Sequence, residues 1–159
     1  MRDLRPTSNK VLQALFNILY SVRGKIFLDL FAGTGQVGLT ALKKGTDFVV
    51  FVEIEKYRSK KIEIECEKFG FSERFKVYSV DVLYFLKKEK DQVYDIVFAD
   101  PPYNYRSYDK LIEDCLRVLK KDGIFILEHR SSGGFHSYKE LVYDERVYDD
   151  TKLTFWRKV

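Results

Sequence analysis

The sequence predicts a single α/β domain built on a doubly wound, mostly parallel sheet. Short apolar runs, rich in β-branched and aromatic residues, alternate with segments whose apolar residues recur at helical spacing. The segment 138–159 departs from this alternation, because it contains two strand-like runs and no helical pattern. We therefore expect seven strands with helices on both faces, and a C-terminal pair that forms an antiparallel hairpin.

In chain order the expected elements are a helix at 8–20, a strand at 25–31, a helix from the turn at 33–35 to about 44, a strand at 48–52, a helix at 57–69, a strand at 75–80, a short helix through 85, a strand at 94–99, a helix at 108–119 and a strand at 124–128. The helices are predicted because apolar residues recur three or four positions apart, as Val11, Leu15 and Leu19 do in the first. The strands are predicted from short apolar runs that stop at turn residues. Asp149-Asp150 is the turn that divides the C-terminal hairpin.

Composition restricts the class of protein. The 159 residues are 45% hydrophobic and 33% charged, which is typical of one globular domain over 1–159. No apolar run approaches the roughly 20 residues of a membrane helix, and the N-terminus lacks the apolar core of a secretory signal, so we expect a cytoplasmic protein. Cys66 and Cys115 are isolated, which predicts packing roles and no metal site. The net charge of +4 suits a nucleic-acid partner without requiring one.

The end of the first predicted strand carries a glycine-rich turn. Ligands of doubly wound sheets bind at the carboxyl ends of the strands, and glycines there let the backbone approach a ligand closely. Residues 33–38 match GxGxxG, so a nicotinamide dinucleotide site is one interpretation, and a plain turn is another. Asp29 is evidence against a dinucleotide, because its carboxylate would repel a pyrophosphate. It suits a ligand with a cationic end.

Carboxylates also follow the second and third predicted strands. Glu53 can accept both hydrogen bonds of a ribose diol, or it is a solvated loop acid. Asp81 can accept a hydrogen bond from the amino group of an adenine while Val82 packs against the ring. The alternative for Asp81 is the N-cap of the next helix, and the two roles are compatible.

The fourth predicted strand ends in Asp100-Pro101-Pro102-Tyr103. Each proline restrains its own φ and the residue before it, so the carboxylate of Asp100 and the carbonyl of Pro101 point in defined directions. Tyr103 adds a ring on which a base can stack. Two acceptors beside an aromatic face suit an exocyclic amino group on a planar heterocycle, although a simple strand terminator is the alternative.

These residues resemble the class I S-adenosylmethionine-dependent methyltransferases, and DPPY resembles the signature of those that act on amino nitrogens of bases. The family-level likeness extends over further motifs, namely Leu4-Arg5-Pro6-Thr7 before VLQALFNIL, DLFAGTGQVGLTALKKG, VE, IVFADPPY, Ile126-Leu127-Glu128-His129 and the segment 148–156. As a set they resemble the bacterial 16S ribosomal RNA guanine-N2 methyltransferase family, whose domain is Rossmann-like. Relatives carry about one β-hairpin before the RPT segment, and we expect it to be absent here, which puts RNA docking in doubt more than chemistry.

The resemblance implies methyl transfer from S-adenosylmethionine to N2 of a guanine in 16S ribosomal RNA or an assembling small subunit, with S-adenosylhomocysteine as product. It implies a monomer with no membrane association. The implied catalytic residues are Asp100, Pro101, Pro102 and Tyr103. The implied cofactor site consists of Asp29, Phe31, Ala32, Gly33, Thr34, Gly35, Glu53, Ile54, Asp81 and Val82. Arg5, Thr7 and His129 are expected to order cofactor or substrate, with an N-cap and a structural histidine as the alternatives.

Three other functions stay open. An adenine N6 or cytosine N4 methyltransferase of DNA or RNA would use the same DPPY chemistry. A nicotinamide oxidoreductase would explain residues 33–38 but not the DPPY residues. A cofactor-binding module without activity is the third. Basic side chains are interpreted mostly as a solvated face with some phosphate contact, among them Lys43, Lys44, Arg106, Lys110 and Arg130.

Overall fold

The structure is a computed structural model that describes residues 7–130 and 135–159. Its helices are α1 (Asn9–Leu19), α2 (Gln36–Lys43), α3 (Lys56–Lys68), α4 (Val82–Lys88), α5 (Tyr108–Val118) and the short 3-10 helix η1 (Lys139–Leu141). Its strands are β1 (Ile26–Leu30), β2 (Phe48–Val52), β3 (Phe75–Tyr78), β4 (Tyr94–Ala99), β5 (Leu119–Arg130), β6 (Val142–Tyr148) and β7 (Thr151–Arg157). The expected order of helices and strands is confirmed.

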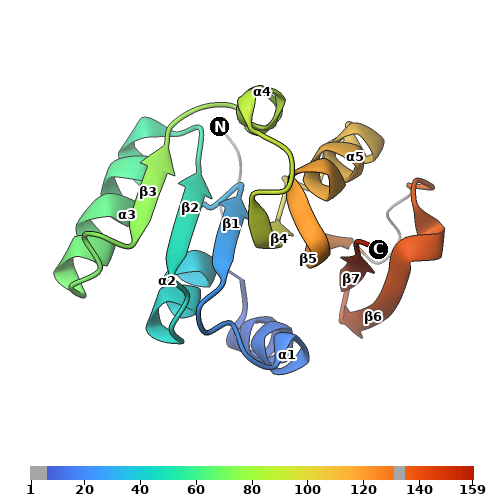
Figure 1. The fold of residues 1–159 in the computed structure, drawn as a ribbon, viewed down its shortest axis with the longest axis horizontal. Coiled ribbons are helices and arrows are strands. Elements are labelled where there is room, and N and C mark those ends of the chain that lie inside the picture. Colours follow the sequence, from blue (N-terminus) through green and yellow to red (C-terminus); the bar gives the residue numbers. More distant parts are fainter. Residues whose placement is uncertain (1–6, 131–134) are drawn as a thin grey trace.

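The strands of the described residues form one seven-stranded sheet in the order β3-β2-β1-β4-β5-β7-β6. Neighbours from β3 to β5 are parallel, whereas β7 runs antiparallel to both β5 and β6. The chain moves outward from β1 to β3 and then crosses back to β4 on the other side of β1 (Figure 1). The switch point of this doubly wound sheet therefore lies between β1 and β4, where ligands of such folds bind.

Two hydrophobic cores sandwich the sheet. Leu28 and Leu30 of β1 face the core under α4 and α5, whereas Phe27 faces the core under α1, α2 and α3. This alternation follows from the twofold periodicity of a strand, and it continues in β7, where Trp156 joins the first core and Phe155 the second. Figure 1 shows α4 and α5 on the opposite side of the sheet from α1 and α2. Both faces are covered, which explains why the central strands are apolar throughout.

Strand β5 is longer than the sequence predicted. Tyr94 pairs with Leu119 and Ile96 with Ile124, so residues 120–123 loop out of the ladder, and Asp122 has a φ of 67° there. The expected turn is thus a bulge within the strand. At its other end β5 continues past residue 128 to Arg130, because β7 pairs with it to the last residue. This extension brings the end of β5 to the carboxyl edge of β4.

Within residues 7–130 and 135–159 no helix is both long and apolar enough to cross a bilayer. The same ranges contain no group of three or more His, Cys, Asp or Glu side chains placed to hold a metal ion. Cys66 and Cys115 are free and buried. Burial raises the pKa of the Cys66 thiol to about 12, so the thiol is protonated and packs as an apolar side chain.

Candidate active site at the switch point

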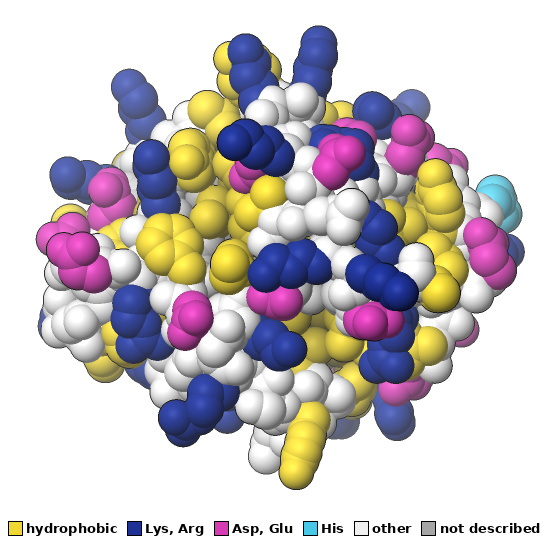
Figure 2. All heavy atoms as spheres, in the orientation of Figure 1, with side chains coloured by type: hydrophobic (Ala, Val, Ile, Leu, Met, Phe, Trp, Pro, Cys, Tyr) yellow, Lys and Arg dark blue, Asp and Glu magenta, His cyan; other side chains and the backbone are white. Residues whose placement is uncertain are grey.

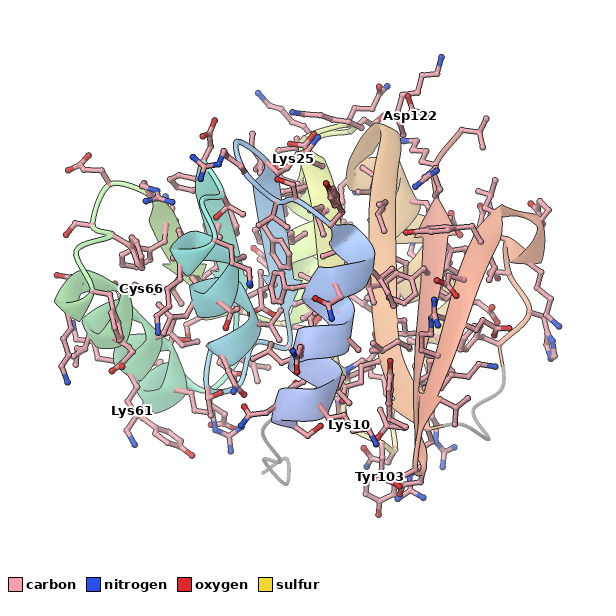
Figure 3. All side chains as sticks on the ribbon, turned by 90° about the horizontal axis from the view of Figure 1, so that it is seen from below. Lys10, Lys25, Lys61, Cys66, Tyr103 and Asp122 are labelled. Atoms are coloured by element: carbon pink, nitrogen blue, oxygen red, sulfur yellow. The ribbon has the colours of Figure 1, made fainter. Side chains whose placement is uncertain are left out.

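The predicted cofactor and substrate segments lie on adjacent strands. Leu30, the last residue of β1, pairs with Ala99, the last of β4, and the N–H of Asp100 lies 3.4 Å from the carbonyl of Leu30. The glycine-rich turn and the DPPY segment therefore leave the sheet side by side. In Figure 3, Tyr103 lies at the lower edge of the sheet, opposite Lys25 and Asp122 at the start of β1 and in the β5 bulge.

The turn after β1 needs its glycines. Gly33 and Gly35 have φ values of 60° and 77°, which glycine adopts without strain. A Cβ on Gly35 would lie 2.8 Å from a methylene carbon of Ile62 on α3, so the turn is also pressed against that helix. Phe31 has a φ of 57°, a left-handed conformation that costs energy for an aromatic residue. Ala32 anchors the turn by donating to the Val52 carbonyl at 3.0 Å.

Asp29 lies beneath this turn and is 1% exposed. Its Oδ2 accepts a hydrogen bond of 3.0 Å from the N–H of Gly38, in the first turn of α2. A carboxylate therefore occupies the end of the helix at which a dinucleotide fold binds its pyrophosphate. This position supports the argument against a dinucleotide ligand. It instead suits a ligand with a cationic group.

Glu53 connects the ends of β1 and β2. It is 2% exposed, and its two carboxylate oxygens accept hydrogen bonds of 2.8 Å from the N–H groups of Gly33 and Glu55. A carboxylate has about four lone-pair positions, so these two bonds leave acceptor capacity for a ligand. Ile54 follows it at the carboxyl edge of the sheet and is 62% exposed. Because this carboxylate is buried, the alternative interpretation of Glu53 as a solvated loop acid is wrong.

Asp81 is the N-cap of α4. Its Oδ2 accepts a hydrogen bond of 3.1 Å from the N–H of Tyr84, and its side chain is exposed at the carboxyl edge. Val82 is buried in the core under α4. Capping uses one oxygen, so the cap and the predicted contact with an adenine are compatible.

The DPPY segment passes from buried to exposed. Pro101 is buried, Asp100 and Pro102 are half-buried, and Tyr103 is 65% exposed. The guanidinium carbon of Arg130 lies 4.5 Å from the centre of the Tyr103 ring. A turn in which Tyr105 donates to the Pro102 carbonyl at 2.9 Å follows the prolines. The segment is thus a stiff rim with a carboxylate at its base and an aromatic ring at its tip.

An aromatic cluster under this rim was not predicted from the sequence. Tyr105 contacts Phe31 edge-on with a centroid separation of 5.3 Å and Tyr108 at the same separation, and Tyr108 contacts Phe135 at 5.8 Å. Burial, and to a lesser degree the charge of the Asp100 carboxylate, raises the pKa of Tyr108. The cluster joins the glycine turn to the DPPY loop. The contacts of Tyr105 with Phe31 and of Tyr108 with Phe135 join segments far apart in the sequence, so no local sequence signal indicated the cluster.

The residues expected to order a ligand occupy different places. The hydroxyl of Thr7 lies 3.4 Å from Oε1 of Glu128, which ties the segment before α1 to the end of β5. His129 is buried, with Nδ1 2.7 Å from the Arg130 carbonyl and Nε2 2.8 Å from the Thr154 hydroxyl. Because a carbonyl only accepts, Nδ1 carries the proton, and burial lowers the pKa of His129. Arg5 lies outside the described residues.

Comparisons with known proteins agree with this architecture. Residues 1–157 match the family described as Conserved hypothetical protein 95. Ribosomal RNA small subunit methyltransferase D of Buchnera aphidicola is 30% identical over 134 residues, which are 79% of this chain and 67% of that protein. The protein of the same name from Haemophilus influenzae is 33% identical over 112 residues, 69% of this chain and 58% of that protein.

The fold is also found among solved structures. An RNA methyltransferase from Salinibacter ruber, in complex with S-adenosyl-L-homocysteine, superposes with a TM-score of 0.75 over 96% of this chain and 93% of that chain, at 15% identity. At that identity the likeness concerns the fold alone, and it confirms the Rossmann-like prediction. On the family match along nearly its whole length, the chain is a member of the Conserved hypothetical protein 95 family, with ribosomal RNA small subunit methyltransferases D among its relatives.

Proposed function

We propose that this protein is a ribosomal RNA methyltransferase that uses S-adenosylmethionine, and that its target is the exocyclic N2 of a guanine in the small-subunit RNA. The observation that carries the proposal is the pairing of Leu30 with Ala99, because the glycine turn and the DPPY segment follow these residues and leave the sheet side by side. The relatives named as small-subunit methyltransferases support the choice of RNA.

The residues at the edge fit S-adenosylmethionine. Asp29 offers a buried carboxylate where an ammonium group would be received, and Glu53 keeps acceptor capacity for ribose hydroxyls after binding two backbone N–H groups. Asp81 and Ile54 are both exposed at the same edge, where the side chain of Ile54 would pack on an adenine. The left-handed glycines keep the turn free of side chains that would block the approach. When bound, the cofactor supplies an electrophilic methyl group on a sulfonium.

Asp100 and the Pro101 carbonyl would act on the amino group of the base. The lone pair of such a nitrogen is delocalised into the ring, so the site must favour its pyramidal, nucleophilic form. Hydrogen bonds from the amino group to these two acceptors strengthen as positive charge develops on nitrogen. Asp100 would then accept the proton that becomes acidic after transfer, with no covalent intermediate. Tyr103 would stack the base, which must be flipped out or already unpaired.

The test is transfer of labelled methyl groups to small-subunit RNA that lacks the modification, free and in assembling subunits. Asp100→Asn removes the charge and keeps the shape, so we expect a loss of about 100-fold or more in rate. Asp122→Asn is the matched control, because Asp122 is exposed in the bulge at the opposite edge and asparagine tolerates its positive φ. Equal rates for the two variants, with S-adenosylhomocysteine bound by both, would exclude the role given to Asp100.

Nucleoside analysis of the product separates the bases. N2-methylguanine supports the proposal, whereas N6-methyladenine or N4-methylcytosine would identify one of the two related activities. Thermal shifts with S-adenosylhomocysteine and with NAD test the cofactor independently, because a ligand that binds only the native state raises the unfolding midpoint. We expect a shift with the first ligand alone. Binding without transfer to any RNA would indicate a module without activity.

A further inference from the structure

One basic side chain stands out at the rim of the candidate site. Arg130 is exposed at the end of β5, and its guanidinium covers the ring of Tyr103 at 4.5 Å. It forms no salt bridge with a carboxylate of residues 7–130 or 135–159. A ring covered on one face that is still 65% exposed must present its other face to solvent. An exposed aromatic face and a guanidinium without a salt bridge to the described residues therefore meet beside the predicted base-binding acceptors.

Two other basic residues named from the sequence, Lys43 and Lys110, are engaged elsewhere. Lys110 pairs with Asp114 at 3.1 Å, and Lys43 lies 4.0 Å from the ring centre of Phe69, at the end of α2 remote from the site. In Figure 2, Lys and Arg side chains are interleaved with acidic and hydrophobic ones and form no continuous basic face in that view. That view faces the edge of the sheet with Lys25 and Asp122, opposite Tyr103, so at the site the relevant observation is the contact of Arg130 with Tyr103.

We propose that Arg130 binds a backbone phosphate of the RNA strand that carries the target base, and that it holds the ring of Tyr103 from one side while the base stacks on the other. This inference rests on the proposed function and adds a substrate-positioning residue to it. A guanidinium can stack on a ring through its face and still donate N–H bonds to phosphate through its edge. One side chain thus connects the stacking surface to the backbone of the strand.

The structure holds both partners in place. The carbonyl of Arg130 accepts the Nδ1–H of His129 at 2.7 Å, and Arg130 pairs with Thr151 in the ladder between β5 and β7. Tyr103 follows two prolines and lies within the turn that the hydrogen bond from Tyr105 to the Pro102 carbonyl closes. The contact itself is weak, as exposed cation–π pairs are, so its value lies in orienting a ring that solvent would otherwise leave mobile.

The experiment compares RNA binding and methyl transfer in wild type, Arg130→Gln, Arg130→Lys and the control Arg23→Gln. Arg23 is exposed beside the start of β1, at the edge opposite Tyr103, and it makes no salt bridge within the described ranges. We expect Arg130→Gln to raise KM for RNA about tenfold with a smaller change in kcat. Its slope of log affinity against log salt should fall by about 1, because one phosphate contact is lost.

Arg130→Lys should keep the salt slope and recover only part of the affinity, since lysine lacks the planar fork. In a Tyr103→Leu background, the effect of Arg130→Gln should shrink, because the two residues act as a unit. If Arg130→Gln matches Arg23→Gln in KM and salt slope while wild type methylates RNA, the role of Arg130 is wrong and the proposed function stands. If wild type neither binds nor methylates any RNA, both fail.

Discussion

Replacing Glu53 by glutamine tests whether its carboxylate stabilises the turns that follow β1 and β2. Both oxygens of Glu53 accept N–H bonds of 2.8 Å, from Gly33 and Glu55, in a setting that is 2% exposed. A hydrogen bond to a charged group is worth roughly 1.5–3 kcal/mol. Glutamine keeps one acceptor and turns an NH₂ group toward the second N–H, so one bond is lost and the other is weakened. We expect the free energy of unfolding to fall by about 2–4 kcal/mol.

Urea denaturation of the ligand-free protein measures this change as a lower midpoint with an unchanged m-value. A protein of this size loses roughly 2–4 °C of Tm per kcal/mol, so thermal unfolding gives a second readout. Glu67→Gln is the control, because Glu67 is exposed on α3 and the chemical change is identical. The control should stay within about 0.5 kcal/mol of wild type. Equal midpoints for the two variants would refute the structural role of the Glu53 carboxylate.

Three further changes have defined outcomes in the same assay. Gly38→Ala should cost roughly 3 kcal/mol, because its Cβ would lie 2.3 Å from the buried ring of Phe51; a midpoint within error of wild type would contradict this packing. Tyr105→Phe should stabilise the protein by about 1 kcal/mol, since the buried hydroxyl has no hydrogen-bond partner among the described residues, and a lower midpoint would reveal one. Burial lowers the pKa of His129 below 6.5, so as the pH falls this histidine is protonated in the unfolded chain before it is protonated in the folded protein. Stability should therefore fall as pH drops below 6.5, by at most about 1.4 kcal/mol per pH unit from this group. His129→Gln should flatten that slope between pH 7.5 and 5, and parallel curves would contradict it.

The fold could be predicted because its signals are local. The apolar run of β2 and the helical spacing of Val11, Leu15 and Leu19 depend on residues a few positions apart, and the structure reproduces both. The long β5 could not be predicted, because its extent depends on pairing with β7 near the C-terminus. The bulge at 120–123 could not be predicted either. Turn residues such as those at 121–123 can separate a helix from a strand, and they can equally interrupt a strand ladder.

The candidate site divides in the same way. Asp29, Glu53 and Asp81 were predicted as cofactor residues from their positions at or near the ends of apolar runs, because parallel strands bring their carboxyl ends to one edge. The contact of Arg130 with Tyr103 could not be found, since it joins the ends of β5 and β4 through side-chain packing alone. His129 was open between a catalytic and a structural role. The ring is buried, and its two nitrogens contact the Arg130 carbonyl and the Thr154 hydroxyl, which favours the structural role.

The three carboxylates predicted to bind the cofactor also accept hydrogen bonds from backbone N–H groups of nearby turns and helices. Asp29 accepts from Gly38 in α2, Glu53 from Gly33 in the turn, and Asp81 from Tyr84 in α4. The cofactor half of the site is therefore preformed by the same groups that would bind the ligand, which reduces the ordering cost on binding. A loss of cofactor binding in variants of these carboxylates consequently mixes two effects, a lost contact and a disordered turn. The exposed side chains of Tyr103 and Arg130 accept no such backbone hydrogen bonds. Their variants therefore report on substrate binding more directly than variants of the buried carboxylates do.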